Sequence, residues 1–305
     1  MQSLLTNSKN SKHKDGFRFR LKKFFSPILC LNDISLDAPL IAVVWQGLIA
    51  EVFSVSLEIH HHLILGTAVW LCYSADRCAE PCFVKGISSS RHLIFKKHKM
   101  PFVFIWIALF FGAFFWSFSV LPFGCLLWGI HLLGLCVANF ILCKKESKTG
   151  TPSSVPKEMR TAGILAFGCV FFPAYEASLD FVNWSVAFFL VFYLLFINCL
   201  SISRWELTLD SMRGSLTFLQ QNPRLLQIFS SSQYIVLFML VFLACTGTAD
   251  FIGILLFVHS LGVCLFVLCL DLVPFLTKND KRMFIDQGYW VLPLFILATS
   301  HADLF

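Results

Sequence analysis

Residues 101–143 read PFVFIWIALFFGAFFWSFSVLPFGCLLWGIHLLGLCVANFILC and contain no Asp, Glu, Lys or Arg. A helix needs about 20 apolar residues to cross the roughly 30 Å hydrocarbon layer of a bilayer. The stretch is long enough for two such helices, and Leu121, Pro122 and Gly124 between its halves are typical of a tight turn. Since every backbone amide within lipid must be satisfied internally, a run of this length predicts a helical hairpin across a membrane.

The composition of the whole chain agrees with this local pattern. Its 305 residues are 57% apolar and 16% aromatic, and only 14% are charged. Soluble globular domains carry about 25% charged residues. Such a ratio excludes a water-soluble globular protein, because one core cannot hide so many apolar side chains. Most of the twelve cysteines lie within apolar runs, where they behave as small apolar residues, and no disulfide framework is indicated.

Long apolar runs recur along the chain and predict nine membrane-spanning helices. The fold class is therefore all-α and polytopic, with a basic cytoplasmic N-terminal segment at 1–37 and a nine-helix transmembrane domain at 38–305. Within the N-terminal segment, a short helix lying in the membrane interface and a disordered basic tail are equally compatible with the pattern. The expected spans are 38–57, 61–77, 101–120, 122–143, 160–178, 183–204, 232–249, 251–272 and 286–303.

The basic residues supply an orientation. With these spans, all 24 Lys and Arg fall in the N-terminal segment and in alternate connections, and the remaining connections hold none. The positive-inside rule then places the N-terminus in the cytoplasm and the C-terminus on the opposite side. The net charge of +6 is explained by loops that face anionic lipid headgroups. The bilayer is thus the expected partner, and nucleic acid is not.

Two predicted spans end in closely spaced acidic residues on the cytoplasmic side. Asp76 and Glu80 are four residues apart at the end of the second span, so a continuing helix presents both on one face. Glu206 and Asp210 have the same spacing after the sixth span, in a row that begins with Asn198 and Ile202. Carboxylates brought together in this way repel one another unless a cation lies between them.

Magnesium is the expected cation, because it prefers carboxylate oxygens and binds in proteins together with substrate phosphates. Arg77, Arg91, Lys96 and Lys97 stand nearby in the sequence and could hold those phosphates. The alternative is that the acids are interfacial charges that balance the basic loops.

At these residues the sequence resembles the UbiA superfamily of intramembrane prenyltransferases. The stretch from Ala68 to Glu80, AVWLCYSADRCAE, is similar to the first Asp-rich motif of that family, N-x-x-x-D-x-x-x-D. Three further segments are similar to a poorly characterised bacterial branch: Leu36-Asp-Ala-Pro-Leu, Arg91-His92, and residues 198–206. The resemblance implies nine helices around a central cavity, and a place in the bacterial inner membrane.

The resemblance also implies an activity and a set of site residues. Mg²⁺ held by Asp76, Glu80, Glu206 and Asp210 would neutralise a prenyl diphosphate, whose phosphates Arg77, Arg91, Lys96, Asn198 and Arg204 would contact. The prenyl group would then pass to a lipophilic, for example aromatic, acceptor.

Two departures from the family pattern keep a second function open. Cys72 stands where the motif has Asn, and Glu80 stands where it has its last Asp. In the second motif, the pair Asn198 and Ile202 and the pair Glu206 and Asp210 are both candidates. The alternative function is therefore that of a non-catalytic UbiA-like protein that binds or transports lipid.

Two polar residues lie deep in the fourth predicted span, His131 and Asn139. We expect both to form hydrogen bonds to other helices, since an unpaired polar group is costly in hydrocarbon.

Overall fold

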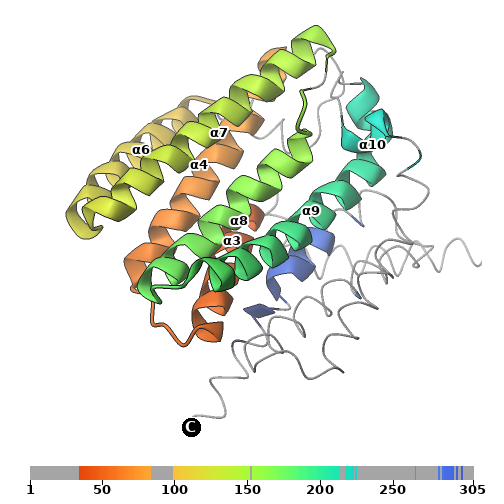
Figure 1. Cartoon of the computed structure of the whole chain (residues 1–305). Coiled ribbons are helices and arrows are strands. Elements are labelled where there is room, and N and C mark those ends of the chain that lie inside the picture. The colour runs from red at the N-terminus through yellow and green to blue at the C-terminus, as the bar shows by residue number, and fades with distance from the viewer. Residues whose placement is uncertain are drawn as a thin grey trace, which may run out of the picture.

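The computed structural model describes residues 34–83, 99–151, 153–212, 217–222, 224, 265, 281, 284–291, 293–294 and 297, and all of its regular elements there are helices (Figure 1). The side chains of residues 77–83, 99, 208–210 and 212 lie outside this description, as do the predicted span 232–249 and all of the span 251–272 except residue 265. Residues 284–291, in the ninth predicted span, form a segment that we call the C-terminal helix. The other helices are α3 (Asp37–Val52), α4 (Ile59–Phe83), α6 (Lys99–Val120), α7 (Phe123–Thr149), α8 (Lys157–Glu176), α9 (Phe181–Met212) and α10 (Phe218–Gln221).

Three of the described helices contain a segment long and apolar enough to cross a membrane: Met100–Val120, Phe123–Thr149 and Phe181–Leu207. They coincide with the third, fourth and sixth predicted spans. An all-helical fold with three candidate membrane-spanning helices is confirmed among the described residues, and the nine spans and the central cavity stay predictions.

The hairpin predicted from residues 101–143 is present. The backbone N–H of Leu121 still donates to the Ser117 carbonyl of α6 at 2.9 Å, and Pro122 then takes an extended conformation from which α7 starts. Nothing lies within 4 Å of where a Cβ on Gly124 would be, so this glycine is not needed for space. The turn depends on Leu121 and Pro122.

The first predicted span is shorter than its apolar run suggested. It was expected to end at residue 57, but α3 ends at Val52, and Ser54 then takes a left-handed conformation with φ of 53°. The N–H of Val55 turns back to the Ala50 carbonyl at 2.9 Å. At 1.5 Å per residue, the 16 residues of α3 extend about 24 Å, less than the hydrocarbon thickness.

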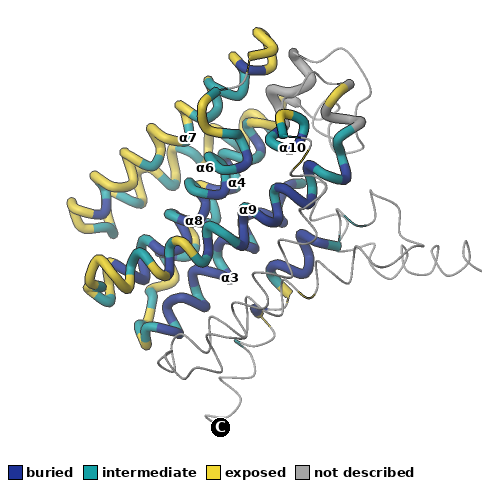
Figure 2. Tube along the Cα trace, turned by 45° about the vertical axis from the view of Figure 1, so that its right-hand side comes forward, coloured by how far each residue is buried: buried dark blue, intermediate teal, exposed yellow. Residues whose placement is uncertain are grey.

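Burial separates the helices into inner and outer ones. Figure 2 shows α3 largely buried, whereas the α6–α7 hairpin is exposed along most of its length. α3 packs against α4 and α8, α8 packs against α7 and α9, and α6 packs against α4. The outer surface of the hairpin carries exposed Phe, Leu, Ile, Val and Trp side chains, as expected of a surface solvated by lipid.

The C-terminal helix completes the inner layer. The indole N–H of Trp45 in α3 donates to the Tyr289 carbonyl at 2.9 Å, and the Tyr289 hydroxyl donates to the Leu194 carbonyl in α9 at 2.8 Å. Tyr289 is fully buried. One residue therefore joins the first described helix, the last one and α9.

A polar network joins α7 to α8 across their connection. The guanidinium of Arg160 donates to both carboxylate oxygens of Glu146, at 2.9 Å each, and its Nε donates to the Asn139 oxygen at 2.8 Å. It also donates to the Ser153 hydroxyl and the Val155 carbonyl of the connection. Sequence reasoning counted Arg160 as one more basic loop residue and missed this pairing.

The two polar residues predicted to form hydrogen bonds to other helices have different outcomes. Asn139 is confirmed, since besides the bond from Arg160 its amide donates to the Thr161 hydroxyl of α8 at 3.5 Å. For His131 the prediction is wrong, because its Nδ1 pairs with the Leu127 carbonyl one turn earlier in α7, at 2.7 Å. Its own helix already supplies the partner.

Candidate functional site

A pocket of about 80 Å³ opens where α3 and α8 begin and where α4 and α9 approach their ends, and we call this side of the bundle the pocket end. Five segments contribute to it, the fifth being the C-terminal helix. The lining residues are Asp37, Ala38, Ile41, Tyr73, Thr161, Ala162, Leu165, Leu195, Asn198, Cys199, Ile202 and Asp286.

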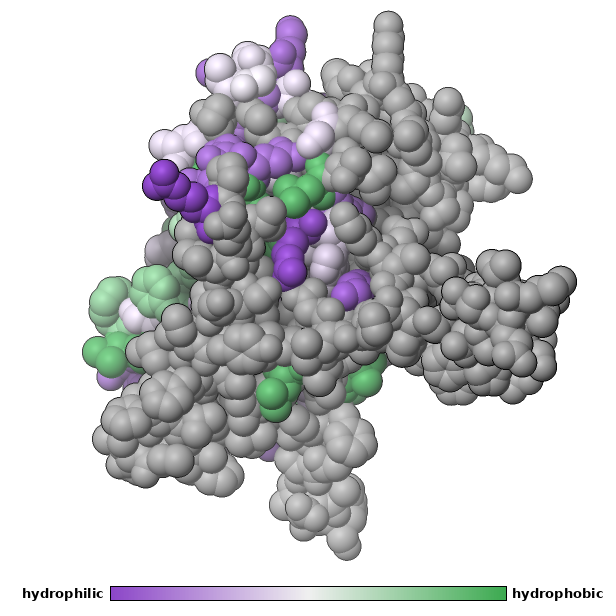
Figure 3. Space-filling model, turned by 90° about the vertical axis from the view of Figure 1, so that its right-hand side faces the viewer, coloured by the Kyte–Doolittle hydropathy of each residue, from purple (hydrophilic) through white to green (hydrophobic). Residues whose placement is uncertain are grey.

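The predicted topology explains why these segments meet. Successive spans cross in opposite directions, so the start of an odd-numbered span and the end of an even-numbered one lie on the same side. In the predicted topology, the spans that begin at 38, 160 and 286 and those that end at 77 and 204 would have these ends on one side, the side that the basic residues predict to be cytoplasmic. On the face shown in Figure 3, most of the hydrophilic residues that are coloured lie in the upper half, the half in which α7 ends and α10 lies in Figure 1.

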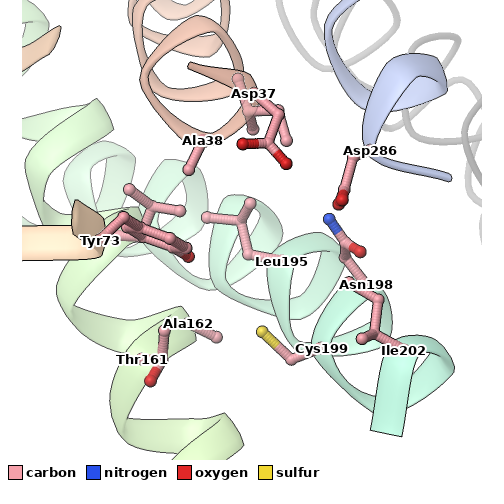
Figure 4. Close-up of a pocket in the computed structure, with 12 residues that line it drawn as sticks. Asp37, Ala38, Tyr73, Thr161, Ala162, Leu195, Asn198, Cys199, Ile202 and Asp286 are labelled. Carbon is pink, nitrogen blue, oxygen red and sulfur yellow. The ribbon is translucent and has the colours of Figure 1, made fainter. Parts of the chain in front are cut away.

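The pocket combines an apolar wall with a few buried polar groups. Ala and branched aliphatic side chains from α3, α8 and α9 form the wall. Among the polar residues, Asp37 is 4% exposed, Asn198 6% and Asp286 7%. Figure 4 shows these three side chains turned toward one another, with Tyr73 and Thr161 on the opposite side of the view.

Asn198 has one polar atom that the described residues leave unsatisfied. Its Oδ1 is buried and has no hydrogen-bond partner among them. Leaving a buried acceptor unsatisfied costs about 1–3 kcal/mol, so such a group is informative wherever it borders a pocket.

Two residues of the first candidate motif, Cys72 and Asp76, lie near cysteines of α7. The Cys72 thiol interacts with the Cys136 thiol of α7, and Asp76 is close enough to Cys143 of α7 to act on it electrostatically. Tyr73 is the α4 residue that lines the pocket. Cys72, which stands in place of the motif's Asn, does not line the pocket.

The second candidate motif reaches the pocket through its first pair. Asn198 and Ile202 line it, but Ile202 has no atom that can ligate a metal. Arg204 and Glu206 follow in α9 and are half-buried, and the side chain of Asp210 lies outside the described residues. Of the two registers that the sequence left open, Asn198 and Ile202 are the pair that faces the pocket.

The remaining predicted site residues cannot be located in the same way. Arg77 and Glu80 lie in α4, but their side chains are outside the described residues, as is the whole of Arg91 and Lys96. Among the described side chains, no group of three His, Cys, Asp or Glu is placed to hold a metal ion. Because Glu80 and Asp210 are not in that set, the Mg²⁺ site at the four acids stays a prediction.

Two acids line the pocket, Asp37 and Asp286. The sequence analysis gave neither of them a role in the site. Asp37 opens α3 and Asp286 lies in the C-terminal helix, 249 residues later. The available signal was that both acids begin predicted spans on the same side of the membrane. Nothing in the sequence states that the first and ninth spans are neighbours.

Comparison of the chain with models of known families, with characterised proteins and with solved structures gave no match.

Proposed function

We propose that this chain is an integral membrane prenyltransferase of UbiA type, in which Mg²⁺ and a prenyl diphosphate bind near the pocket end. The observation that supports this most is the polar pocket itself, which lies beside Tyr73 of α4 and Asn198 of α9. These are the two helices that carry the candidate motifs. The bacterial inner membrane is the location that the resemblance implies.

The size of the pocket limits what it can hold. Sites that enclose a drug-sized ligand measure about 300–1,000 Å³. At about 80 Å³, this pocket has room for an ion or a small polar headgroup, and the isoprenoid chain would lie outside it, along the apolar helices.

In this proposal the chain's own residues bind and orient the donor. Asp76, Glu80, Glu206 and Asp210 would hold Mg²⁺, which when bound neutralises the diphosphate and makes it a better leaving group. Arg77, Arg91, Lys96, Asn198 and Arg204 would contact its phosphate oxygens. The bond between the allylic carbon and the diphosphate oxygen breaks, and the acceptor forms a new bond to that carbon and loses a proton to water.

The test uses the full chain in lipid nanodiscs with labelled prenyl diphosphates of several lengths, Mg²⁺ and a membrane lipid extract. We expect a labelled lipophilic product that requires Mg²⁺. In Asp76→Asn the rate should fall by about 100-fold, the loss typical of removing a group that stabilises developing charge. Asp180→Asn is the matched control, because Asp180 lies at the start of α9, away from the pocket end. No product from any donor, with diphosphate binding unchanged in Asp76→Asn, would refute the proposal.

One observation favours a second function, the binding or transport of a lipid without chemistry. The Cys72 thiol, which stands in place of the motif's Asn, is directed at Cys136 of α7. A thiol at this position offers the diphosphate one ligand fewer than the motif's Asn would. Tight, Mg²⁺-independent binding of an isoprenoid lipid, with no turnover, would select this alternative.

A further inference from the structure

A pair of thiols from two different helices meets outside the pocket. The Cys72 thiol of α4 and the Cys136 thiol of α7 share a hydrogen bond. Both cysteines are free and half-buried. They belong to the second and fourth predicted spans, so the fold brings them together and not their position in the sequence.

A second interaction shows that the two helices stay close beyond this pair. Asp76 follows Cys72 by one helical turn, and it acts electrostatically on Cys143, which follows Cys136 by two turns. Both interactions come in the same order along α4 and α7. The two helices therefore run in the same direction here, as the predicted topology requires of two even-numbered spans.

Neighbouring helices hold the two thiols in position. The indole N–H of Trp106 in α6 donates to the Leu71 carbonyl, directly before Cys72, at 3.0 Å. On the other helix, Asn139 lies one turn after the second thiol and accepts a hydrogen bond from Arg160 of α8 at 2.8 Å. Since both backbones are held close to the pair, a reaction between the thiols has the advantage of an intramolecular one.

The covalent reaction open to two thiols in contact is oxidation to a disulfide. Cys136 precedes Lys144, the first basic residue after the fourth predicted span, by about 12 Å along α7. The pair is thus expected in the cytoplasmic half of the bilayer. Disulfides on the cytoplasmic side of mesophile proteins are rare, and those that form are usually transient, with a catalytic or redox-sensing role.

We propose that Cys72 and Cys136 are a redox-sensitive pair that hydrogen peroxide oxidises to a reversible disulfide between α4 and α7. This oxidant is small and uncharged, so it can reach half-buried thiols within a bilayer. One thiol loses its proton and attacks the peroxide, whose O–O bond breaks to give a sulfenic acid and one water. The second thiol then attacks the sulfenic sulfur, the S–S bond forms, and a second water leaves. A reducing dithiol restores both thiols by exchange.

The disulfide would change the wall of the pocket that α4 supplies. A sulfur–sulfur bond is about 2 Å long, shorter than any hydrogen bond between two thiols, so oxidation draws α4 toward α7. Tyr73, the residue after Cys72, lines the pocket. The oxidation step itself needs no prenyl transfer. Its test therefore contains no prenyl diphosphate, and its failure would leave the proposed function standing.

The experiment treats the reduced full chain in lipid nanodiscs with hydrogen peroxide, denatures it in sodium dodecyl sulfate and counts the free thiols with a maleimide polymer on a gel. We expect the wild type to lose two reactive thiols and to regain them with dithiothreitol. Cys72→Ala and Cys136→Ala should each abolish this loss. Cys125→Ala is the matched control and should still lose two thiols, because Cys125 is a free cysteine at the start of α7, away from the pair.

Two measurements on the wild type keep the test decisive if a variant folds poorly. Mass spectrometry of the oxidised, digested protein should show one linked peptide that contains Cys72 and Cys136. Oxidised protein should also unfold at a higher concentration of sodium dodecyl sulfate than reduced protein, since a cross-link constrains the unfolded chain. The proposal is overturned if the wild type loses no thiols, if the linked peptide joins other cysteines, or if the loss persists in Cys72→Ala.

Discussion

Replacing Arg160 by Met should destabilise the bundle by about 3 kcal/mol. The side chains of Arg160 and Glu146 are each only 10% exposed, and their two bonds of 2.9 Å form a fork-to-fork pair. Breaking a buried pair by removing one partner costs about 3–5 kcal/mol, because the other charge stays buried. We take the low end because Glu146 would keep the bond that it accepts from the Ser153 N–H at 3.1 Å.

The assay is the free energy of unfolding in mixed micelles, titrated with sodium dodecyl sulfate and followed by circular dichroism. Lys148→Met is the matched control, since Lys148 is an exposed cation in the last turn of α7 and its loss should change stability little. The double variant Glu146→Leu, Arg160→Met removes both charges and should recover most of the loss. If Arg160→Met costs less than about 1 kcal/mol, or if the two single changes simply add, the network is not what joins α7 to α8.

Two further outcomes follow from the fold. A Cβ on Gly168 of α8 would lie 3.0 Å from a leucine side chain of α4, whereas one on Gly134 meets nothing within 4 Å. Gly168→Val should therefore cost about 1–3 kcal/mol by overpacking and Gly134→Val much less, in the same unfolding titration. An epitope inserted after Thr151, between α7 and α8, should be reached by antibody only from the cytoplasm, and one after Leu179, between α8 and α9, only from outside. If antibody reaches both epitopes from the same side, the prediction that α8 crosses the membrane is wrong.

The apolar runs predicted the most exposed helices best. α6, α7 and the first part of α9 face lipid over long stretches, so their sequences carry an uninterrupted apolar signal, and the predicted bounds 101–120 and 183–204 lie within the helices observed. α3 was predicted less well. Its apolar run continues past Val52, but the chain leaves the helix at Ser54, which has a left-handed backbone conformation. A hydropathy pattern carries no information about backbone conformation.

The candidate site was predicted only in part, for a geometric reason. Spacing fixes which residues of one helix share a face, and Asn198 and Ile202 do face the pocket together. Spacing does not fix which neighbour that face meets. Cys72 lies beside Cys136 of α7, and the acids that line the pocket, Asp37 and Asp286, are far apart in the sequence.

The bonds made by Tyr289 have a consequence for the order of assembly. Trp45 emerges from the ribosome 244 residues before the carbonyl that receives its indole proton. Until the last span is inserted, α3 and α9 share no such bridge, and the side of the pocket that Asp286 forms is missing. The pocket is therefore completed only once the C-terminal helix has been added. A nascent or truncated chain that stops short of residue 284 would leave Asp37 and Asn198 beside a pocket with one wall missing.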